Sequence, residues 1–435
     1  TIKSGKVSLD IAPQASKEFT VPVNGLKSQP GTEYFVNFSV TTVEPEPLIP
    51  AGYEIAYDQF QLPIQAEKRI YKANGPALTT ATSGDELTVS SSKVNFVFNK
   101  KSGLVTSYKV DGTEYFKDGF GIQPNFWRAP NDNDYGNGAP KRLQVWKQSS
   151  KNFHVTDVKM TTENKVVSLK ATYLLAAGNL YVVTYRIYPS GIVNVSAQFT
   201  STDMQAAETE VSEATRMATF TPGSDAARKA ASKLEVPRIG VRFRLPAQMN
   251  NVQYFGRGPE ENYIDRNHGT LVGVYKTTAD KMYFNYVRPQ ENGHHTDTRW
   301  IALSPDKGNG LAIVADSLIG FNALRNSIED FDSEEALPHP YQWNNFSPEE
   351  VANHDEKAAR NVLRRMHHVN DITPRDFVEV CVDMKQQGVG GYDSWGARPE
   401  PFHQIPANRD YSWGFTLVPV RSASQANEVA KYDYQ

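Results

Sequence analysis

Apolar residues alternate with polar ones in several stretches of the chain. An alternation with a period of two is what a β-strand needs when one of its faces is buried. It occurs at Val36, Phe38 and Val40; at Val94, Phe96 and Phe98; at Val193, Val195, Ala197 and Phe199; at Val241, Phe243 and Leu245; and at Val378, Val380 and Val382. Turn-forming pairs such as Ser102-Gly103, Asp111-Gly112 and Ser190-Gly191 separate strands as hairpin connections do.

Signals for helices are few. Ser347 followed by Pro348 and two acidic residues predicts a helix start, and the Ala-rich segment 224–234 is a short helix or an exposed loop. No ten-residue helical pattern alternates with the strands, which disfavours a (β/α) barrel or a doubly wound sheet. The pattern favours an all-β sandwich architecture.

The distribution of strands and polar stretches predicts two units. Residues 1–66 hold several short strands, residues 67–86 form a polar linker, residues 87–420 form a much larger strand-rich unit, and residues 421–435 form a loose tail. A first unit of this length is short for an immunoglobulin-like sandwich, which needs about 100 residues. We therefore expect an incomplete sandwich, and the absence of Met at Thr1 agrees with a piece of a longer protein.

Composition excludes several classes of function. The 435 residues include 46 Lys and Arg against 49 Asp and Glu, so no basic excess exists to bind nucleic acid. One cysteine, Cys381, cannot form an internal disulfide or a thiolate metal cluster. No apolar stretch approaches 18 residues, so no transmembrane helix and no membrane partner are expected.

Two motifs raise the question of a metal. Residues 131–138, NDNDYGNG, offer closely spaced oxygens that calcium prefers, but they lack the EF-hand register of Gly and Glu. A loop whose Asn and Asp side chains cap its own turns is the favoured interpretation. His294 and His295 are adjacent, and adjacent residues of a strand point to opposite faces, so we assign no metal site.

Aromatic residues are abundant, with 21 Tyr, 21 Phe and 6 Trp, and one of them stands apart. Trp395 lies in a glycine-flanked loop directly after a predicted strand, where no core periodicity accounts for it. Its flat face suits the C–H face of a sugar, and its indole N–H can donate a hydrogen bond. The alternative is a Trp that plugs the sheet edge, and the sequence leaves both open.

Five ordered motifs together resemble the C-terminal part of β-galactosidases of glycoside hydrolase family 2. They span nearly the whole chain, which makes the resemblance far more specific than any single motif. They are LDIAPQ at 9–14, FWRAPNDNDYG at 126–136, YFGRGPEENYIDR at 254–266, PQENG at 289–293 followed by TRW at 298–300, and GVGGYDSW at 388–395.

The resemblance implies both a fold and a set of site residues. It implies most of an immunoglobulin-like domain at 1–66 and, at 87–420, a large antiparallel β-supersandwich similar to galactose mutarotase. Trp395 matches a Trp that positions substrate. Gly136 matches a Gly that begins a mobile loop near the active site, with Asp132 and Asp134 just before it. The sequence after Gly136 departs from the family pattern.

The same resemblance implies what this chain does not contain. The family's two catalytic carboxylates and its magnesium ligands lie in an upstream (β/α) barrel, so we expect no catalytic residue and no cofactor here. The implied partners are that barrel and a galactoside substrate, with a homo-oligomer left open. The compartment, cytoplasmic or periplasmic, also stays open.

Two other functions compete with this interpretation. One is an independent carbohydrate-binding module. The other is an aldose epimerase, which needs a positioned Glu and His as base and acid, and the motifs supply no such pair. The five ordered motifs favour the non-catalytic region of a β-galactosidase.

Overall fold

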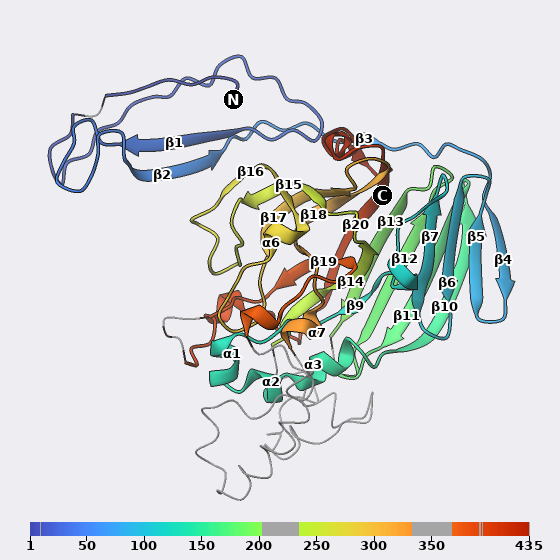
Figure 1. The fold of residues 1–435 in the computed structure, drawn as a ribbon. Helices are drawn as coiled ribbons and strands as arrows, with labels where there is room; N and C mark the ends of the chain where they lie inside the picture. Colours follow the sequence, from blue (N-terminus) through green and yellow to red (C-terminus); the bar gives the residue numbers. More distant parts are fainter. Residues whose placement is uncertain (9, 202–234, 333–367, 391–392, 394, 435) are drawn as a thin grey trace, which may run out of the picture. The chain divides into compact units, whose positions relative to one another are not determined.

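The computed structural model describes residues 1–8, 10–201, 235–332, 368–390, 393 and 395–434, and it divides the chain into two units, Thr1–Lys68 and Arg69–Gln435. The helix start predicted at Ser347 and the Ala-rich segment 224–234 lie outside the described residues. Strands dominate both units (Figure 1), which confirms the all-β prediction. In the described part of the chain, no helix has the length and apolar content required to cross a membrane.

The first unit contains one antiparallel pair, β1 (Phe35–Thr41) and β2 (Glu54–Gln61). The predicted alternation of β1 is confirmed: Val36, Phe38 and Val40 are half-buried, and the polar residues between them are exposed. Phe38 meets Phe60 of β2 with ring centroids 5.8 Å apart. The described residues of this unit thus contain two strands, whereas an immunoglobulin-like sandwich has seven.

The second unit is built on two antiparallel sheets. The larger one, of 12 strands, follows the order β10-β11-β12-β13-β20-β18-β17-β15-β16, with β14 and β9 joined to it through β19. Its strands are β9 (Gln123–Asn125), β10 (His154–Glu163), β11 (Val166–Leu174), β12 (Leu180–Ile187), β13 (Val193–Thr200), β14 (Arg238–Pro246), β15 (Asn251–Gly258), β16 (Leu271–Thr278), β17 (His295–Ser304), β18 (Gly310–Leu324), β19 (Phe377–Gln386) and β20 (Tyr411–Val420).

The smaller sheet, of five strands, lies against β11 and β12. Phe96 and Phe98 contact the ring of Tyr185, and the hydroxyl of Tyr173 donates to the carbonyl of Gly103 at 2.7 Å. Its strands run in the order β4 (Thr79–Ser83), β5 (Glu86–Ser90), β6 (Val94–Asn99), β7 (Leu104–Val110) and β8 (Thr113–Glu114). Part of the predicted linker 67–86 is therefore a strand of this sheet.

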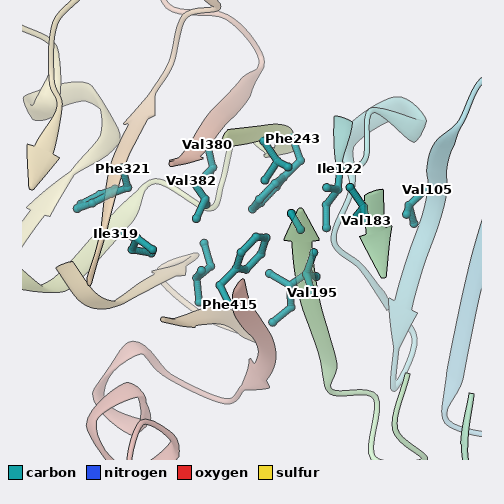
Figure 2. Packing of buried hydrophobic residues seen from close by; sticks show 14 of the residues in the cluster. Val105, Ile122, Val183, Val195, Phe243, Ile319, Phe321, Val380, Val382 and Phe415 are labelled. Atoms are coloured by element: carbon teal, nitrogen blue, oxygen red, sulfur yellow. The ribbon is translucent and has the colours of Figure 1, made fainter. Parts of the chain in front are cut away.

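Short helices occupy the connections. They are α1 (Asp132–Gly136), α2 (Ala139–Arg142), α3 (Gln144–Ser149), α6 (Ala279–Met282), α7 (Ile328–Phe331) and α9 (Ala426–Val429), with 3-10 turns η1 (Lys117–Gly119), η5 (Val369–Asp371), η6 (Pro401–His403) and η7 (Ala423–Gln425). The main core lies between the sheets. Figure 2 shows side chains from distant strands meeting there, among them Val195, Phe243, Val382 and Phe415.

Strands β14 and β19 differ from the prediction. Their pattern predicts one solvent-facing polar side, but Arg242, Glu379 and Asp383 are all buried. The polar side chains are paired instead of solvated: Arg242 Nη1 lies 3.4 Å from Glu379, and Arg238 Nε lies 3.2 Å from Asp383. Burial of charge is tolerated when the charges are paired in this way.

Residues 421–435 also differ from the loose tail that their polar sequence suggests. They contain η7, α9 and a short strand, β21 (Tyr432–Asp433), which pairs in parallel with β3 (Arg69–Ile70). Tyr434 is only 4% exposed, its ring packs on Tyr71, and its carbonyl accepts from the hydroxyl of Tyr188 at 2.6 Å. The last described residues therefore belong to a second apolar cluster, in which Tyr434 packs with Tyr71 and Tyr188.

Replacing Tyr434 with Ala should test this correction. Loss of a buried aromatic ring costs about 3–5 kcal/mol of folding free energy, because it removes apolar contacts and leaves a cavity. Urea unfolding of Tyr434→Ala should show a loss of that size. Ile70→Ala is a control, because Ile70 is 77% exposed on the paired strand and should change stability by less than about 0.5 kcal/mol. If the two variants were equally stable, residues 421–435 would not pack on the unit, and the prediction of a loose tail would be right.

Candidate functional site

The motif at residues 131–136 forms a helix that caps itself. The Asn131 side chain accepts from the backbone N–H of Asp134 at 2.8 Å, and the Asp134 carboxylate accepts from the backbone N–H of Asn131 at 3.2 Å. This is a capping box, which satisfies two amides at the start of α1. The self-capping interpretation is confirmed, although the segment is a short helix instead of a loop.

A buried arginine fastens α1 to the end of β19. Both Nη2 contacts of Arg128 to the Asp134 carboxylate measure 3.1 Å, and its Nη1 donates to the carbonyls of Gln387 and Gly388 at 2.7 and 3.0 Å. Arg128 and Asp134 are both almost fully buried. Through Arg128, the buried Asp134 carboxylate therefore holds the start of the segment that leads to Trp395. It is almost inaccessible to solvent.

The segment 388–397, which we call the Trp395 loop, is held from its other side by Asp265. One oxygen of the Asp265 carboxylate accepts from the N–H of Val389 and the other from the N–H of Gly390, both at 3.1 Å. An added Cβ on Gly388 would come within 2.3 Å of that carboxylate, so only Gly allows this approach. Within the loop, Gly391, Tyr392 and Ser394 lie outside the described residues.

Asn133 of α1 fixes the far end of the Trp395 loop. Its amide nitrogen donates to the carbonyl of Asp393 at 2.9 Å, and its oxygen accepts from the N–H of Gly396 at 3.2 Å. The Asp393 carboxylate accepts from three backbone N–H groups, of Trp395, Gly396 and Ala397, at 2.8 to 3.1 Å. These bonds, the one from Ala397 first, lower the pKa of Asp393.

Trp395 is thus an exposed side chain on a firmly held backbone. Its side chain is 76% exposed, so the alternative in which it plugs the sheet edge is wrong. A Cβ built on Gly136 would lie 1.9 Å from the carbonyl oxygen of Trp395, which explains the glycine at that place. Figure 1 shows α1 beside the orange-red chain that carries this loop.

Asp132 lies at the surface of α1. Its carboxylate pairs with Arg288 Nη1 at 3.4 Å, and the guanidinium of Arg288 lies 3.7 Å from the ring centroid of Tyr135. Burial raises the pKa of Tyr135 to about 12, so its ring is neutral near pH 7. Of the predicted site residues, Gly136 contacts Trp395 directly, Asp134 acts through Arg128, and Asp132 lies one helical turn from Gly136.

Four residues of this site were not predicted from the sequence as site residues: Arg128, Asn133, Asp265 and Asp393. All four lie in the recognised motifs. Their role depends on backbone amides and carbonyls of a distant segment, and the spacing of residues does not reveal such partners.

Three of the carboxylates near Trp395, those of Asp134, Asp265 and Asp393, are committed to structural hydrogen bonds. Asp134 holds Arg128, Asp265 holds two amides, and Asp393 holds three with a lowered pKa. A general acid for glycoside hydrolysis needs a carboxyl whose pKa is raised, together with a second carboxyl across the bond. The carboxyl groups of Asp134, Asp265 and Asp393 therefore do not match that pair, and Asp132, an exposed carboxylate on α1, is paired with Arg288.

The structure does bring a Glu and a His together elsewhere, in a buried polar cluster. Asn322 donates to Glu291 at 2.9 Å, and its side-chain oxygen lies 2.9 Å from His294 Nδ1. Burial, aided by the charge of Arg238, lowers the pKa of His294 to about 3. The adjoining cavity, about 10 Å³, has room for about one water molecule and none for a hexose. The geometry therefore does not support epimerase chemistry at this pair.

Comparison with known protein families identifies the family to which the chain belongs. The family model described as β-galactosidase small chain matches residues 90–417, and the model for β-galactosidase domain 4 matches residues 1–63. The chain belongs to the β-galactosidase small-chain family, preceded by a domain 4 segment. This confirms the resemblance to a C-terminal portion of these enzymes.

Curated relatives agree with that membership. The β-galactosidase of Priestia megaterium is 32% identical over 95% of this chain and 34% of its own length, and that of Streptococcus thermophilus is 24% identical over 96% and 35%. The chain thus spans about a third of the length of the curated relatives it matches. Among solved structures, a galactose 1-epimerase from Lactobacillus acidophilus aligns over 80% of this chain and 98% of its own, at 9% identity and a TM-score of 0.38.

Replacing Gly136 with Ala should displace the Trp395 loop. Ala is the better helix former by about 1 kcal/mol, so an unhindered site would gain stability. Here the new methyl group would clash with the backbone of Trp395 and Gly396, which cannot move away as a flexible side chain can. Such overpacking costs about 1–3 kcal/mol of folding free energy. We expect lower stability to urea and faster proteolysis within 388–397. Gly5→Ala, where the added carbon meets nothing within 4 Å, should change neither, and unchanged proteolysis of Gly136→Ala would contradict the contact.

The buried histidines predict acid sensitivity. Burial lowers the pKa of His294 to about 3 and of His295 to about 4, so between these values and the ordinary value near 6.5 the unfolded chain binds protons that the folded chain does not. Stability should therefore fall as pH falls through this window, with each histidine contributing about 1.4 kcal/mol per pH unit. Asp383 opposes one of them, because burial raises its pKa to about 7 and the folded form binds its proton first.

Urea unfolding between pH 6 and 4.5 measures this dependence. His294→Gln keeps a donor for Asn322 but removes the titrating ring, so the slope of unfolding free energy against pH should fall by about one proton. His295→Gln should do the same. A slope equal to that of the unsubstituted chain in both variants would show that these rings titrate alike in the folded and unfolded states.

Proposed function

We propose that this chain is the non-catalytic C-terminal region of a β-galactosidase that hydrolyses terminal β-D-galactosides, and that it completes the substrate pocket with Trp395. The observation that carries the proposal is the combination of an exposed indole with a backbone fixed on three sides. Gly136 touches the carbonyl of Trp395, the Asp393 carboxylate accepts from its N–H, and Asn133 binds Asp393 and Gly396.

This arrangement suits a sugar. An aromatic face packs on the C–H face of a pyranose, and the indole N–H can reach a hydroxyl group. A side chain whose backbone is already ordered loses less conformational entropy when it binds. The loop therefore acts as one prepared wall of a pocket, with the other walls supplied by another part of the enzyme.

The catalytic groups are assigned to an upstream (β/α) barrel, which is this chain's principal partner. A pair of carboxyl groups is needed, about 5–5.5 Å apart for retention of configuration, whereas Asp134, Asp265 and Asp393 are held by Arg128 and by backbone amides, and Asp132 is paired with Arg288. We assign the magnesium ligands to the barrel as well.

The parent enzyme that contains this chain offers the test. Trp395→Ala should raise KM for a chromogenic galactoside about tenfold to a hundredfold, the equivalent of about 1–3 kcal/mol of stacking. Its melting temperature should stay close to that of the unsubstituted enzyme, because Trp395 is 76% exposed. Phe402→Ala, a change at another exposed aromatic residue (71%) on η6, is the matched control.

Two results would overturn the proposal. Unchanged kinetics in Trp395→Ala would show that Trp395 does not contact the substrate. Turnover by the purified 435-residue chain alone, free of host enzyme, would show that it carries catalytic carboxylates of its own.

A further inference from the structure

An exposed ion pair, Asp132–Arg288, lies at α1, the helix that packs on the backbone of Trp395, and has no evident structural purpose. The side chains of Asp132 and Arg288 are 52% and 32% exposed, and their closest charged atoms are 3.4 Å apart. Exposed pairs of this kind contribute little to folding stability, since water screens them. Their oxygens and N–H groups stay accessible to a ligand.

Helix geometry places Asp132 on the face of α1 that packs on the backbone of Trp395. Asp132 and Gly136 are four residues apart on α1, so they lie on the same face of the helix, about one turn apart. Gly136 is the residue against which the Trp395 carbonyl packs, and the intervening Asn133 binds the loop on both sides of Trp395. A pyranose ring resting on Trp395 is therefore within reach of Asp132.

Arg288 is held in a defined orientation. Its guanidinium stacks on Tyr135, 3.7 Å from the ring centroid, while Nη1 faces Asp132. The pair presents a carboxylate, which accepts hydrogen bonds, beside a planar guanidinium, which donates them. Two neighbouring hydroxyl groups on a sugar each donate and accept one bond, so they match this edge, and bonds to charged groups are the stronger ones.

We infer that Asp132 and Arg288 form a hydroxyl-recognition edge that binds two adjacent hydroxyl groups of the galactoside stacked on Trp395. The inference rests on the proposed function, because it places its ligand on the same indole. It adds specificity-determining residues: Trp395 binds any pyranose face of suitable shape, and the ion pair selects the sugar by its hydroxyl pattern.

The experiment compares inhibition constants in the parent enzyme. The probes are methyl β-D-galactoside and its four analogues that each lack one hydroxyl group, at C2, C3, C4 or C6. The variants are Asp132→Asn and Arg288→Met, which keeps part of the stacking on Tyr135. Each should weaken methyl β-D-galactoside about tenfold. Against the analogues lacking the recognised hydroxyl groups, each variant should equal the unsubstituted enzyme, because the contact is already missing.

The control is Asp111→Asn, which removes a second exposed ion pair, Lys93–Asp111, with the same 3.4 Å separation on the smaller sheet. It should leave every inhibition constant unchanged. Melting temperatures measured on all variants exclude a general loss of structure.

The outcomes separate the two proposals. If Asp132→Asn and Arg288→Met weaken all five probes equally, or none of them, the recognition edge is wrong. If Trp395→Ala still raises KM in that case, the proposed function stands without it. If Trp395→Ala has no effect, the substrate contact itself fails, whatever the ion pair does.

Discussion

The buried guanidinium of Arg128 is the interaction on which the candidate site depends. It bonds to Asp134 and to two consecutive carbonyls, of Gln387 and Gly388, and so joins segments about 250 residues apart in the sequence. A buried ion pair adds little net stability because desolvation offsets the attraction, but breaking it leaves a charge without a partner. The geometry is thus strongly specified at this point, where α1 meets the chain that follows β19.

The same principle explains why the interior of the larger unit carries so much charge. Arg238 and Arg242 on β14 face acidic side chains on β19, and Glu291 and Asn322 complete the neighbourhood of Arg238. Such a network tolerates few alternative registers, because a slip of one residue would leave buried charges unpaired. The hydrophobic core supplies the driving force for folding, and the polar pairs decide which strands become neighbours.

Sequence patterns predicted those strands whose environment is one-sided. In β6, for example, Val94, Phe96 and Phe98 are buried and the residues between them are half-buried, so alternation reports the fold directly. The pattern failed where both faces are buried, because Glu379 finds its partner Arg242 on another strand that sequence spacing cannot identify. It also failed at Tyr434, since two or three residues are too few to show a period.

The candidate site was predictable only in part, for a related reason. Trp395 and Gly136 were identified through motifs, and the loop glycines around Trp395 marked it as exceptional. The function of Asp265 was hidden, because its partners are backbone N–H groups, and every residue except proline has one. Sequence reasoning therefore found the exposed residue of the candidate site better than the residues that hold its backbone in place.

The parallel pairing of β3 with β21 has a consequence for synthesis of the protein. Arg69 donates to the carbonyl of Lys431, and Tyr71 donates to that of Asp433, so strands about 360 residues apart must meet. Contacts of such long sequence separation form late, because closing the intervening chain is entropically costly. During synthesis, the rings of Tyr71 and Tyr188 stay uncovered until Tyr434 has been made and can pack against them. A nascent chain interrupted shortly before this point presents an aromatic patch, the kind of surface that chaperones hold and that drives aggregation.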